Sequence, residues 1–591
     1  MTAVETLSAN MSSENCTNCV SEEKADLEGV AIFEKYMCHL LPHNVTWLAS
    51  PPPWCTDLSL SNETLVSRTK KWAENLSWDT YLPELQSNDG VAPPVKVAVN
   101  DVFGRHLVAT RSIVPGEVLI VEPPLILSLR EKSPPYCSTC YKRAEDFTCP
   151  SCGFFLCSAE CSTAEHQEEC AVLQGLGLGE PTEGGERKRE ETLIRERLNT
   201  MPSEQRAEAQ TLFQKAQKAA IQQKHLKILR YYIVVHAVRT LLAMSHSDLK
   251  RKIILSLQGN SDKESQRYRV NQKRIVDVLM NELHVATDST LVHRICSVWD
   301  TNGFEVPLGW GTRVHGLYPF ASLLTHDCRS NTQQWFTGAG DLVLRAVDHI
   351  PQGEVVTTCY TDPQWATMLR QDHLRLSKQF TCTCRRCCDP TELGTFMGSP
   401  LCPGCGGPVV SSAPLDPKAD WICHSGCPHT ATAKEVAGIG AEVGNGLRQL
   451  CPTDPAALTA LADRLKARLH PTHHILLQLH VSTLRTIANK NLAELSDEEV
   501  STLATIANLV MGVVRLLEAP LTRLTVRVAR EDLRLQLEML RRSRAAGHDT
   551  RATLQALSMQ VGQCELALGW DTRMPSFLPV LQQYRAMMEA C

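Results

Sequence analysis

Two stretches of the chain alternate short β-branched runs with turn residues, and together they predict a β-rich unit. The first begins at Val95 and reads VKVAVNDVFGRHLVATRSIVPGEVLIVEPPLIL, with the turn sequences FGR and PGE between its apolar runs. Apolar runs bounded by Gly and Pro in this way are typical of consecutive strands. The second stretch extends from Leu308 to Tyr360 and has turns at GAGD and PQGE. The β-rich unit is therefore expected to be split by the residues between its two parts.

Helical spacing of apolar residues dominates most of the remaining chain. It covers residues 205–244 and 270–282, inside the split, and from about Ala433 the pattern predicts one helix after another. The longest apolar run of this part, Ile506 to Ala519, has 14 residues and contains Arg515, so it is too short to span a bilayer and no membrane association is expected. Helix-on-helix packing explains the leucine stripes at spacings of three and four: Leu458, Leu461, Leu465 and Leu469, then Leu533, Leu537 and Leu540.

Composition and charge exclude several classes of protein. The 591 residues are 43% hydrophobic and 21% charged, which is typical of a folded chain of several domains. A net charge of −5 gives no basic field for nucleic acid, so no direct nucleic-acid binding is expected. Residues 1–94 carry little pattern and predict a poorly ordered N-terminal extension. Of the 25 cysteines, 15 fall into clusters with metal-ligand spacing, and no N-terminal signal segment is found. Metal binding in a reducing compartment is therefore favoured over disulfides.

The densest cysteine cluster lies in residues 137–170 and predicts two metal sites. Its sequence, CSTCYKRAEDFTCPSCGFFLCSAECSTAEHQEEC, holds seven cysteines and one histidine. Eight soft ligands suit two tetrahedral sites, and Zn²⁺ is the ion that such sets favour. A piece this small cannot bury a sufficient apolar core, so metal would supply its folding free energy. The ligands are Cys137, Cys140, Cys149, Cys152, Cys157, Cys161, His166 and Cys170.

Two further clusters bring the expected total to about four zinc ions. Residues 382–388 read CTCRRCC, in which Cys382, Cys384 and Cys387 need a fourth ligand. Adjacent Cys388 is sterically awkward for that role, and Cys328 is the distant alternative. The other cluster resembles a zinc ribbon, although its last spacing is one residue longer than CxxC, so His424 or His429 could compete. Its two close pairs are Cys402 with Cys405 and Cys423 with Cys427.

In combination these segments resemble the SET and MYND domain protein-lysine methyltransferases. The cysteine array is similar to a MYND finger, and FGRHLVATRSIVPGEVLIVEPPLI, GLYPFASLLTHDCRSNT, LRAVDHIPQGEVVTTCYTD and FTCTCRRC match SET segments in the expected order. The run from TTCYTD to the ribbon-like pair looks specifically like the arthropod branch of that family. The resemblance covers roughly residues 95 to 590.

The resemblance implies an α+β multidomain fold. Its parts would be the N-terminal extension (1–94), the first part of a split SET domain (95–132), the MYND zinc finger (137–170), a helical insert (171–305), the SET core (306–364), a post-SET and zinc-ribbon-like segment (378–430) and a C-terminal helical, TPR-like domain (431–591). The finger would then be an insertion that recruits partners rather than one that performs chemistry.

The family's activity implies S-adenosylmethionine-dependent methylation of a lysine in a histone or other protein. Methyl transfer is an in-line displacement, so positioning the amine supplies much of the rate, and desolvation helps the lysine to lose its proton. Tyr360 matches the family's catalytic tyrosine. Cofactor contacts carry over by position to Gly104, Arg105, His106, Asn302, Ser322, Thr325, His326, Tyr360 and Phe380.

The same resemblance assigns the metal ligands. It selects Cys328 over Cys388 as the fourth ligand of the third site. In the finger it pairs Cys137, Cys140, Cys157 and Cys161 on one ion, and Cys149, Cys152, His166 and Cys170 on the other.

Three departures from the family pattern define an alternative function. His106 stands where a second glycine is usual, Thr325 replaces an asparagine, and Lys378 with Gln379 replaces a channel aromatic. The main hypothesis is an active methyltransferase. The alternative is a catalytically weak or inactive regulatory adaptor that binds proline-containing peptides through the finger. Either protein is expected to be a monomer in the cytoplasm, the nucleus or both.

Overall fold

The structure is a computed structural model of the chain. Residues 1–93 and most of the link between 180 and 221 lie outside the described residues, so the predicted N-terminal extension is not described. The described residues are 94–131, 133–179, 215, 219, 222–260, 263–309, 311–448, 455–487, 490–518, 522–557, 561–562 and 578–589.

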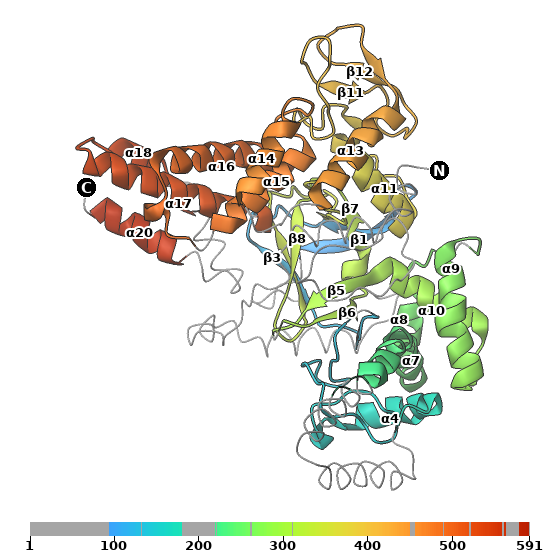
Figure 1. Cartoon of the computed structure of the whole chain (residues 1–591). Helices are drawn as coiled ribbons and strands as arrows, with labels where there is room; N and C mark the ends of the chain where they lie inside the picture. Colours follow the sequence, from blue (N-terminus) through green and yellow to red (C-terminus); the bar gives the residue numbers. More distant parts are fainter. Residues whose placement is uncertain are drawn as a thin grey trace, which may run out of the picture.

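The two β-rich stretches form one unit, because strands from the first pair with strands from the second (Figure 1). Strands β3 and β4 each pair antiparallel with a strand more than 180 residues later, and further bridges join Val108 to Val355 and Ile113 to Ile350. The split unit expected from the sequence is thus present. Its strands are β1 (Val95–Asn100), β2 (Gly104–Ala109), β3 (Val118–Glu122), β4 (Ile126–Ser128), β5 (Gly303–Pro307), β6 (Arg313–Leu317), β8 (Thr332–Phe336) and β9 (Leu342–Ala346).

The first turn of this unit has a clear local cause. The Asn100 side-chain oxygen accepts hydrogen bonds from the backbone N–H groups of Val102 and Phe103, at 3.0 and 2.7 Å. Gly104 then adopts φ = +62°, a conformation that glycine tolerates best. Beyond the turn, alternate residues of β2 enter a core in which Leu107, Tyr318, Leu344 and other side chains are fully buried.

The cysteine array is fastened to the helical insert and to the β unit by one arginine. Arg239 lies on α7 (Tyr232–His246) and pairs with Glu169 of α4 (Ala164–Leu173) at 2.8 Å. Its guanidinium also donates to the carbonyls of Ser138, at 2.6 Å, and Leu127, at 2.8 Å. The array is therefore held by the fold and does not hang from it as a free module.

The predicted helix over 270–282 is not a regular α-helix. Helix α9 (Gln266–Asn271) passes into two π-helical turns, η4 (Gln272–Val276) and η5 (Val278–Glu282). Among the described residues, the insert also contains the helices α8 (Asp248–Ser256) and α10 (Ser289–Asn302).

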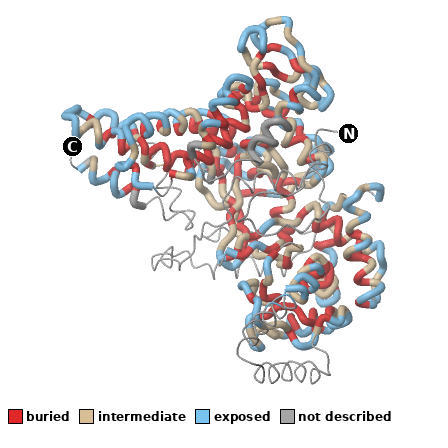
Figure 2. The backbone as a smooth tube through the Cα atoms, viewed as in Figure 1, coloured by how far each residue is buried: buried red, intermediate tan, exposed pale blue. Residues whose placement is uncertain are grey.

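The C-terminal part is helical, as predicted, and is entered through a small three-stranded ribbon (Figure 1). Figure 2 shows that buried residues line the inner faces of its helices. The segment's elements are α11 (Thr367–Ser377), α12 (Arg385–Cys388), β11 (Val409–Ser411), β12 (Trp421–Cys423), β13 (Thr430–Ala431), α13 (Ala433–Arg448), α14 (Pro455–Leu465), α15 (His474–Ile487), α16 (Asp497–Leu517), α17 (Arg523–Ala545), α18 (Arg551–Ala556) and α20 (Leu578–Glu589).

Helix α16 contains residues 506–517 of the apolar run that the sequence showed and begins nine residues before it. Its 21 residues and mean hydropathy of 1.7 would suit a membrane span, but half of the apolar window is buried inside the protein. The helix begins with a capping box between Ser496 and Glu499 and packs against α15 and α17. Such packing is that of a core helix. Within the described residues, Gln222–Leu229 and Tyr232–His246 pass the same test only as a pair bent by 44°.

Candidate functional site

A short parallel pairing brings the two central segments of the candidate site together. Strand β7 (Thr325–His326) pairs with β10 (Thr357–Thr358), with His326 opposite Thr358. Asn331, which is buried, supports the pairing from one side. Its side-chain oxygen accepts from the Thr357 N–H at 2.8 Å, and its amide nitrogen donates to the Val355 carbonyl at 2.9 Å. Because these hydrogen bonds hold the two strands together, Tyr360, which comes two residues after β10, lies beside the loop that carries His326.

His326 connects Tyr360 to the third cysteine cluster. The backbone N–H of Tyr360 donates to His326 Nδ1 at 3.0 Å, which places the ring proton on Nε2. That nitrogen lies 3.3 Å from Cys328 Sγ. Burial lowers the pKa of His326 to about 4, which agrees with a neutral ring.

The hydroxyl of Tyr360 is also fixed by the loop. It donates to the backbone carbonyl of Leu324, and the ring lies 5.2 Å from that of His326. Burial raises the pKa of Tyr360, so its hydroxyl stays protonated. The half-buried Phe380 ring also lies near His326, with 6.0 Å between ring centroids.

Lys378 reaches the same place from the end of α11. Its Nζ lies 5.8 Å from the centroid of the Tyr360 ring and donates to the carbonyl of Thr301 at 2.7 Å. Asn302, which follows Thr301 in the sequence, is the last residue of α10 and is buried. Its amide nitrogen donates to the carbonyls of Gln258 and Val298, at 2.6 and 2.8 Å. Lys378 thus joins the Asn302 segment to Tyr360.

The turn between β1 and β2 leads into Gly104, Arg105 and His106, the first three residues predicted to contact the cofactor. An added side chain at Gly104 would meet no atom within 4 Å, so there is open space beside it. Arg105 donates to the carbonyl of Ser256, and the buried His106 ring lies 2.9 Å from the Gly104 carbonyl oxygen. His106 therefore turns into the protein and does not fill the space beside the loop.

The last two predicted cofactor residues lie between these groups. Ser322 belongs to the short helix η6 (Ala321–Leu323), which β2 contacts, and its hydroxyl donates to Tyr318. Thr325 directs its hydroxyl to Val356. Ser322 thus lies on an element that contacts β2, and Thr325 lies beside the segment that leads to Tyr360.

In the part of the chain that the structure describes, four groups of ligand atoms have the spacing that a metal ion requires. Within each group every ligand atom lies within 4.8 Å of the others. Representative Sγ–Sγ distances of 3.3 to 3.7 Å are close to the ~3.8 Å that a tetrahedral site with Zn–S of about 2.3 Å demands. The groups are Cys137, Cys140, Cys157 and Cys161; Cys149, Cys152, His166 and Cys170; Cys328, Cys382, Cys384 and Cys387; and Cys402, Cys405, Cys423 and Cys427.

This grouping decides between the alternative metal ligands that the sequence left open. Cys328 joins the third group and Cys388 does not, while Cys427 completes the ribbon group without His424 or His429. His166 faces Cys152 through Nε2 at 3.8 Å, which identifies the ring nitrogen available to an ion. The donor sets are those of zinc, and their fit supports Zn²⁺ at all four groups.

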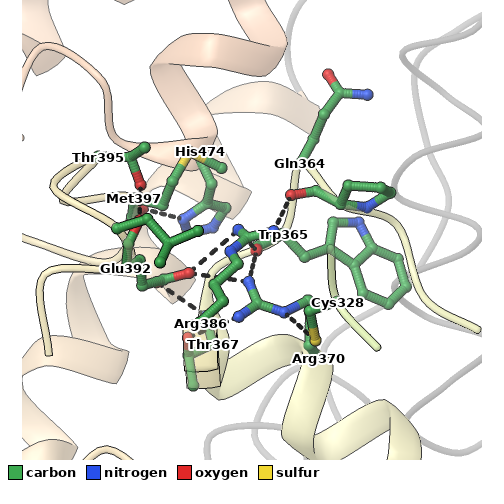
Figure 3. A network of polar contacts seen from close by, with 12 residues as sticks. Cys328, Gln364, Trp365, Thr367, Arg370, Arg386, Glu392, Thr395, Met397 and His474 are labelled. Atoms are coloured by element: carbon green, nitrogen blue, oxygen red, sulfur yellow. Dashed lines mark hydrogen bonds and ion pairs between the residues drawn. The ribbon is translucent and has the colours of Figure 1, made fainter. Parts of the chain in front are cut away.

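A buried pair of arginines lies against the third group (Figure 3). Arg370 Nε donates to Cys328 Sγ at 3.2 Å, and its Nη2 lies 3.6 Å from Cys387 Sγ. Arg370 and Arg386 both pair with the carboxylate of Glu392, at 2.9 and 3.1 Å. Both guanidinium side chains are 0% exposed and Glu392 is 6% exposed, so these charges depend on one another.

Electrostatics in this cluster favours the charged forms of Arg370 and Glu392. Although burial opposes it, Glu392 and the two thiols raise the pKa of Arg370. Burial likewise works against ionisation of Glu392, but the two arginines lower its pKa below the usual range. Two positive charges next to one carboxylate leave a net positive charge, which suits the excess negative charge of four thiolates around a divalent ion.

The same network reaches the C-terminal helices. Glu392 begins a turn whose later residues Thr395 and Met397 present carbonyls to the start of α15 (Figure 3). Thr472 donates to the Thr395 carbonyl, and the His474 ring and backbone both donate to the Met397 carbonyl, at 3.1 Å for the ring. The third cluster is therefore connected to the helical domain by consecutive hydrogen bonds.

Sequence reasoning missed these buried charges. In the sequence Arg370 and Arg386 look like ordinary solvent-facing residues, one in a helix with several charges and one inside CRRCC. Nothing local marks Glu392 as their shared partner. The only available signal was the position of Arg386 between two cysteine ligands.

The residues present fit an adenosine-bearing cofactor. Phe380 offers a half-buried ring for stacking, Gly104 leaves open space for close backbone approach, and Tyr360 has a fixed hydroxyl. They come from segments far apart in the sequence. Of these residues, Tyr360 and Phe380 both lie beside His326.

The chain is similar to several curated proteins over much of its length. It is 26% identical over 393 residues to the SET domain-containing protein SmydA-8, isoform B, of Drosophila melanogaster, covering 64% of this chain and 76% of that one. It is 25% identical over 302 residues to the N-lysine methyltransferase SMYD2-A of Xenopus laevis, covering 49% and 60%. A 72-residue segment, 12% of this chain and 17% of the other, is 44% identical to the mouse histone-lysine N-methyltransferase SMYD3.

Other comparisons add less. No family model matches the chain. The solved SET domain of LSMT bound to lysine and AdoHcy aligns at 12% identity with a TM-score of 0.23, covering 90% of this chain and 92% of that one. That superposition is too loose to place individual residues. The sequence similarities confirm the predicted resemblance, including its arthropod relative.

Proposed function

We propose that this chain, a SMYD-like SET-domain homologue of protein-lysine methyltransferases, transfers methyl groups from S-adenosylmethionine to lysine in a protein substrate. The observation that carries the proposal is the convergence on Tyr360. His326 accepts the Tyr360 N–H and lies next to Phe380, and Lys378 links the Tyr360 ring to the end of α10. These are the positions that the family resemblance assigns to cofactor and substrate.

The chain's own residues would act mainly by positioning. Tyr360 presents a protonated hydroxyl held by the Leu324 carbonyl, which fixes the ring against an incoming amine. His326 fixes the Tyr360 backbone. The partly buried surroundings disfavour the charged form of a substrate lysine, which helps it to lose its proton. S-adenosylmethionine supplies the methyl group when bound. Correct orientation of the amine toward that group is worth several kcal/mol (about 7–11 in model reactions).

We further propose that zinc occupies the four ligand groups in structural roles. All four are closed sets of four protein ligands, which leaves no open coordination position for catalysis. The first two groups would hold the cysteine array together, because it lacks a large core of its own. The third would secure the loop that carries His326. Proline-containing partner peptides would bind the array, as the family resemblance implies.

Calorimetric titration with S-adenosylmethionine, followed by a methyl-transfer assay on histones and peptide libraries, tests the proposal. We expect cofactor binding and methylated lysine, and Tyr360→Phe is expected to reduce turnover at least tenfold while leaving the metal content unchanged. Lack of cofactor binding at millimolar concentration would refute the enzyme function.

The second candidate is the regulatory adaptor. It is favoured by Lys378, whose side chain lies over Tyr360 where the family has a channel aromatic. A protein that binds proline-containing peptides at the array, yet takes up no cofactor, would establish this function instead.

A further inference from the structure

A lysine of the chain itself already lies in the candidate site. Lys378 Nζ is 5.8 Å from the centroid of the Tyr360 ring and donates to the Thr301 carbonyl at 2.7 Å. Thr301 precedes Asn302, one of the residues assigned to the cofactor. A primary amine on a four-carbon stem thus lies beside the candidate catalytic tyrosine and next to the segment assigned to the cofactor.

The backbone around Lys378 holds it there. Lys378 ends α11, with its N–H bonded to the Leu374 carbonyl at 2.9 Å, and its own carbonyl accepts from Asn260 at 3.0 Å. Gln379 then adopts φ = +60°, an uncommon conformation for a residue with a side chain. Lys378 and Phe380 flank Gln379 in the sequence, and both side chains lie in the candidate site. Local strain of this kind is tolerated where the surrounding structure fixes it.

The charged neighbours of the amine leave it able to act as a nucleophile. Burial lowers the pKa of Lys378, although the nearby Asp300 carboxylate opposes this. Burial raises the pKa of Asp300 in turn, which weakens that opposition. His373 of α11 is the other titratable group that interacts with Lys378, and burial lowers its pKa, which favours a neutral ring. Tyr360 faces the amine as a neutral phenol.

We infer that Lys378 is a self-methylation site, an acceptor lysine that this chain carries within its own active site. The inference rests on the proposed function. The Nζ lone pair attacks the methyl carbon of S-adenosylmethionine and a nitrogen–carbon bond forms. The carbon–sulfur bond breaks with its electron pair left on sulfur, giving S-adenosylhomocysteine, and the nitrogen loses its proton to water. An external lysine must displace this side chain before it can be methylated.

The test uses the full-length purified protein with S-adenosylmethionine carrying a CD₃ group. Peptide mass spectrometry is expected to find the label on Lys378, and the rate of its incorporation should be unchanged over a tenfold dilution because donor and acceptor share one chain. Lys378→Arg should abolish the label at this position. Lys418→Arg, a change of an exposed ribbon lysine, serves as the matched control and should leave labelling of Lys378 intact.

Adding a histone mixture separates the two possible failures. Labelled histone lysines with an unlabelled Lys378 would overturn the self-methylation site and leave the proposed function standing. No label on any protein would overturn both. A labelling rate at Lys378 that rises in proportion to protein concentration would also overturn the inference, because it would show that one molecule methylates another. Faster histone labelling by Lys378→Met than by the parent chain is expected if the side chain competes with substrate.

Discussion

The Tyr360 backbone N–H donates to His326 Nδ1 at 3.0 Å, so the position of the candidate catalytic tyrosine depends on the orientation of one imidazole. The other ring nitrogen lies 3.3 Å from Cys328 Sγ, which belongs to the third metal group. Metal binding and tyrosine placement are therefore coupled through a single side chain.

Substitution of His326 tests that coupling. His326→Ala removes the acceptor for Tyr360 and leaves a buried N–H unpaired, at a cost of about 1–3 kcal/mol. We expect kcat to fall roughly 10- to 100-fold with a smaller change in KM, since positioning rather than binding is lost. His326→Asn retains an acceptor and is the matched control, with partial activity expected. Equal loss in both variants would contradict a positioning role.

Arg370 should be essential to the third metal group. Arg370→Met leaves Glu392 and Arg386 buried with altered charge balance and removes a donor to Cys328, so we expect a loss of about 3–5 kcal/mol in unfolding free energy. Chelator-driven zinc release from this group should also accelerate. Chemical denaturation and a zinc-indicator assay measure the two effects.

A control on the same helix makes this prediction specific. Arg375 pairs with Asp372 at a partly exposed position, so Arg375→Met should cost no more than about 1 kcal/mol and leave zinc release unchanged. Arg370→Lys should restore only part of the stability, because lysine lacks the planar fork that reaches two partners. Full rescue by lysine would show that charge alone matters.

Glu122 is expected to make stability depend on pH. Its carboxylate accepts from the backbone N–H groups of Phe320 and Ala321, both at 2.8 Å, and burial raises its pKa to about 8. Because the folded-state pKa lies above the unfolded value, the contribution of this group is fully present below about pH 4.5 and is lost as the pH rises toward 8. The expected slope is at most about 1.4 kcal/mol per pH unit.

Glu122→Gln isolates this effect. The amide cannot ionise, so the variant should show a flatter dependence of unfolding free energy on pH between about 5 and 8. It should also be less stable than the parent at low pH, because one of the two N–H groups loses its acceptor. Denaturant titrations at several pH values provide the measurement, and an unchanged slope would remove Glu122 as its source.

Metal content gives an independent check of the four groups. Elemental analysis should find about four zinc ions per chain, and Cys402→Ser should reduce the number by about one without affecting the cysteine array. A content of two or fewer in the parent protein would refute the third and fourth sites.

The sequence predicted best what local spacing encodes. The array ligands all lie within residues 137–170, and the two pairs of the ribbon each have recognisable spacing. Cys328 lies 54 positions before Cys382, so only the family resemblance could select it over Cys388. Arg370 and Glu392 could not be predicted at all, since a charge in a helical pattern looks the same whether its partner is water or a buried carboxylate.

The secondary structure, too, could be predicted where it depends on local sequence and not where it depends on distant contacts. The alternating runs near Val95 and Leu308 predicted strands, yet the pairing of β3 with β9 requires knowledge of distant contacts. The helical pattern over 270–282 did not predict π-turns, because hydrophobic spacing alone does not register one extra residue per turn. Lys378 stood out in the sequence only as a missing aromatic, and its contact with Thr301 depends on tertiary structure.

The split β unit has a consequence for synthesis on the ribosome. The ligands of the array emerge within 34 residues of one another, so the array can take up its metal while the later strands are still untranslated. Strand β3 must wait for β9, and the third metal group cannot close until Cys387 has left the exit tunnel. A nascent chain stalled just after Tyr360 would carry a loaded array beside an unassembled active site. Such chains would expose an unpaired β3, a natural target for chaperones.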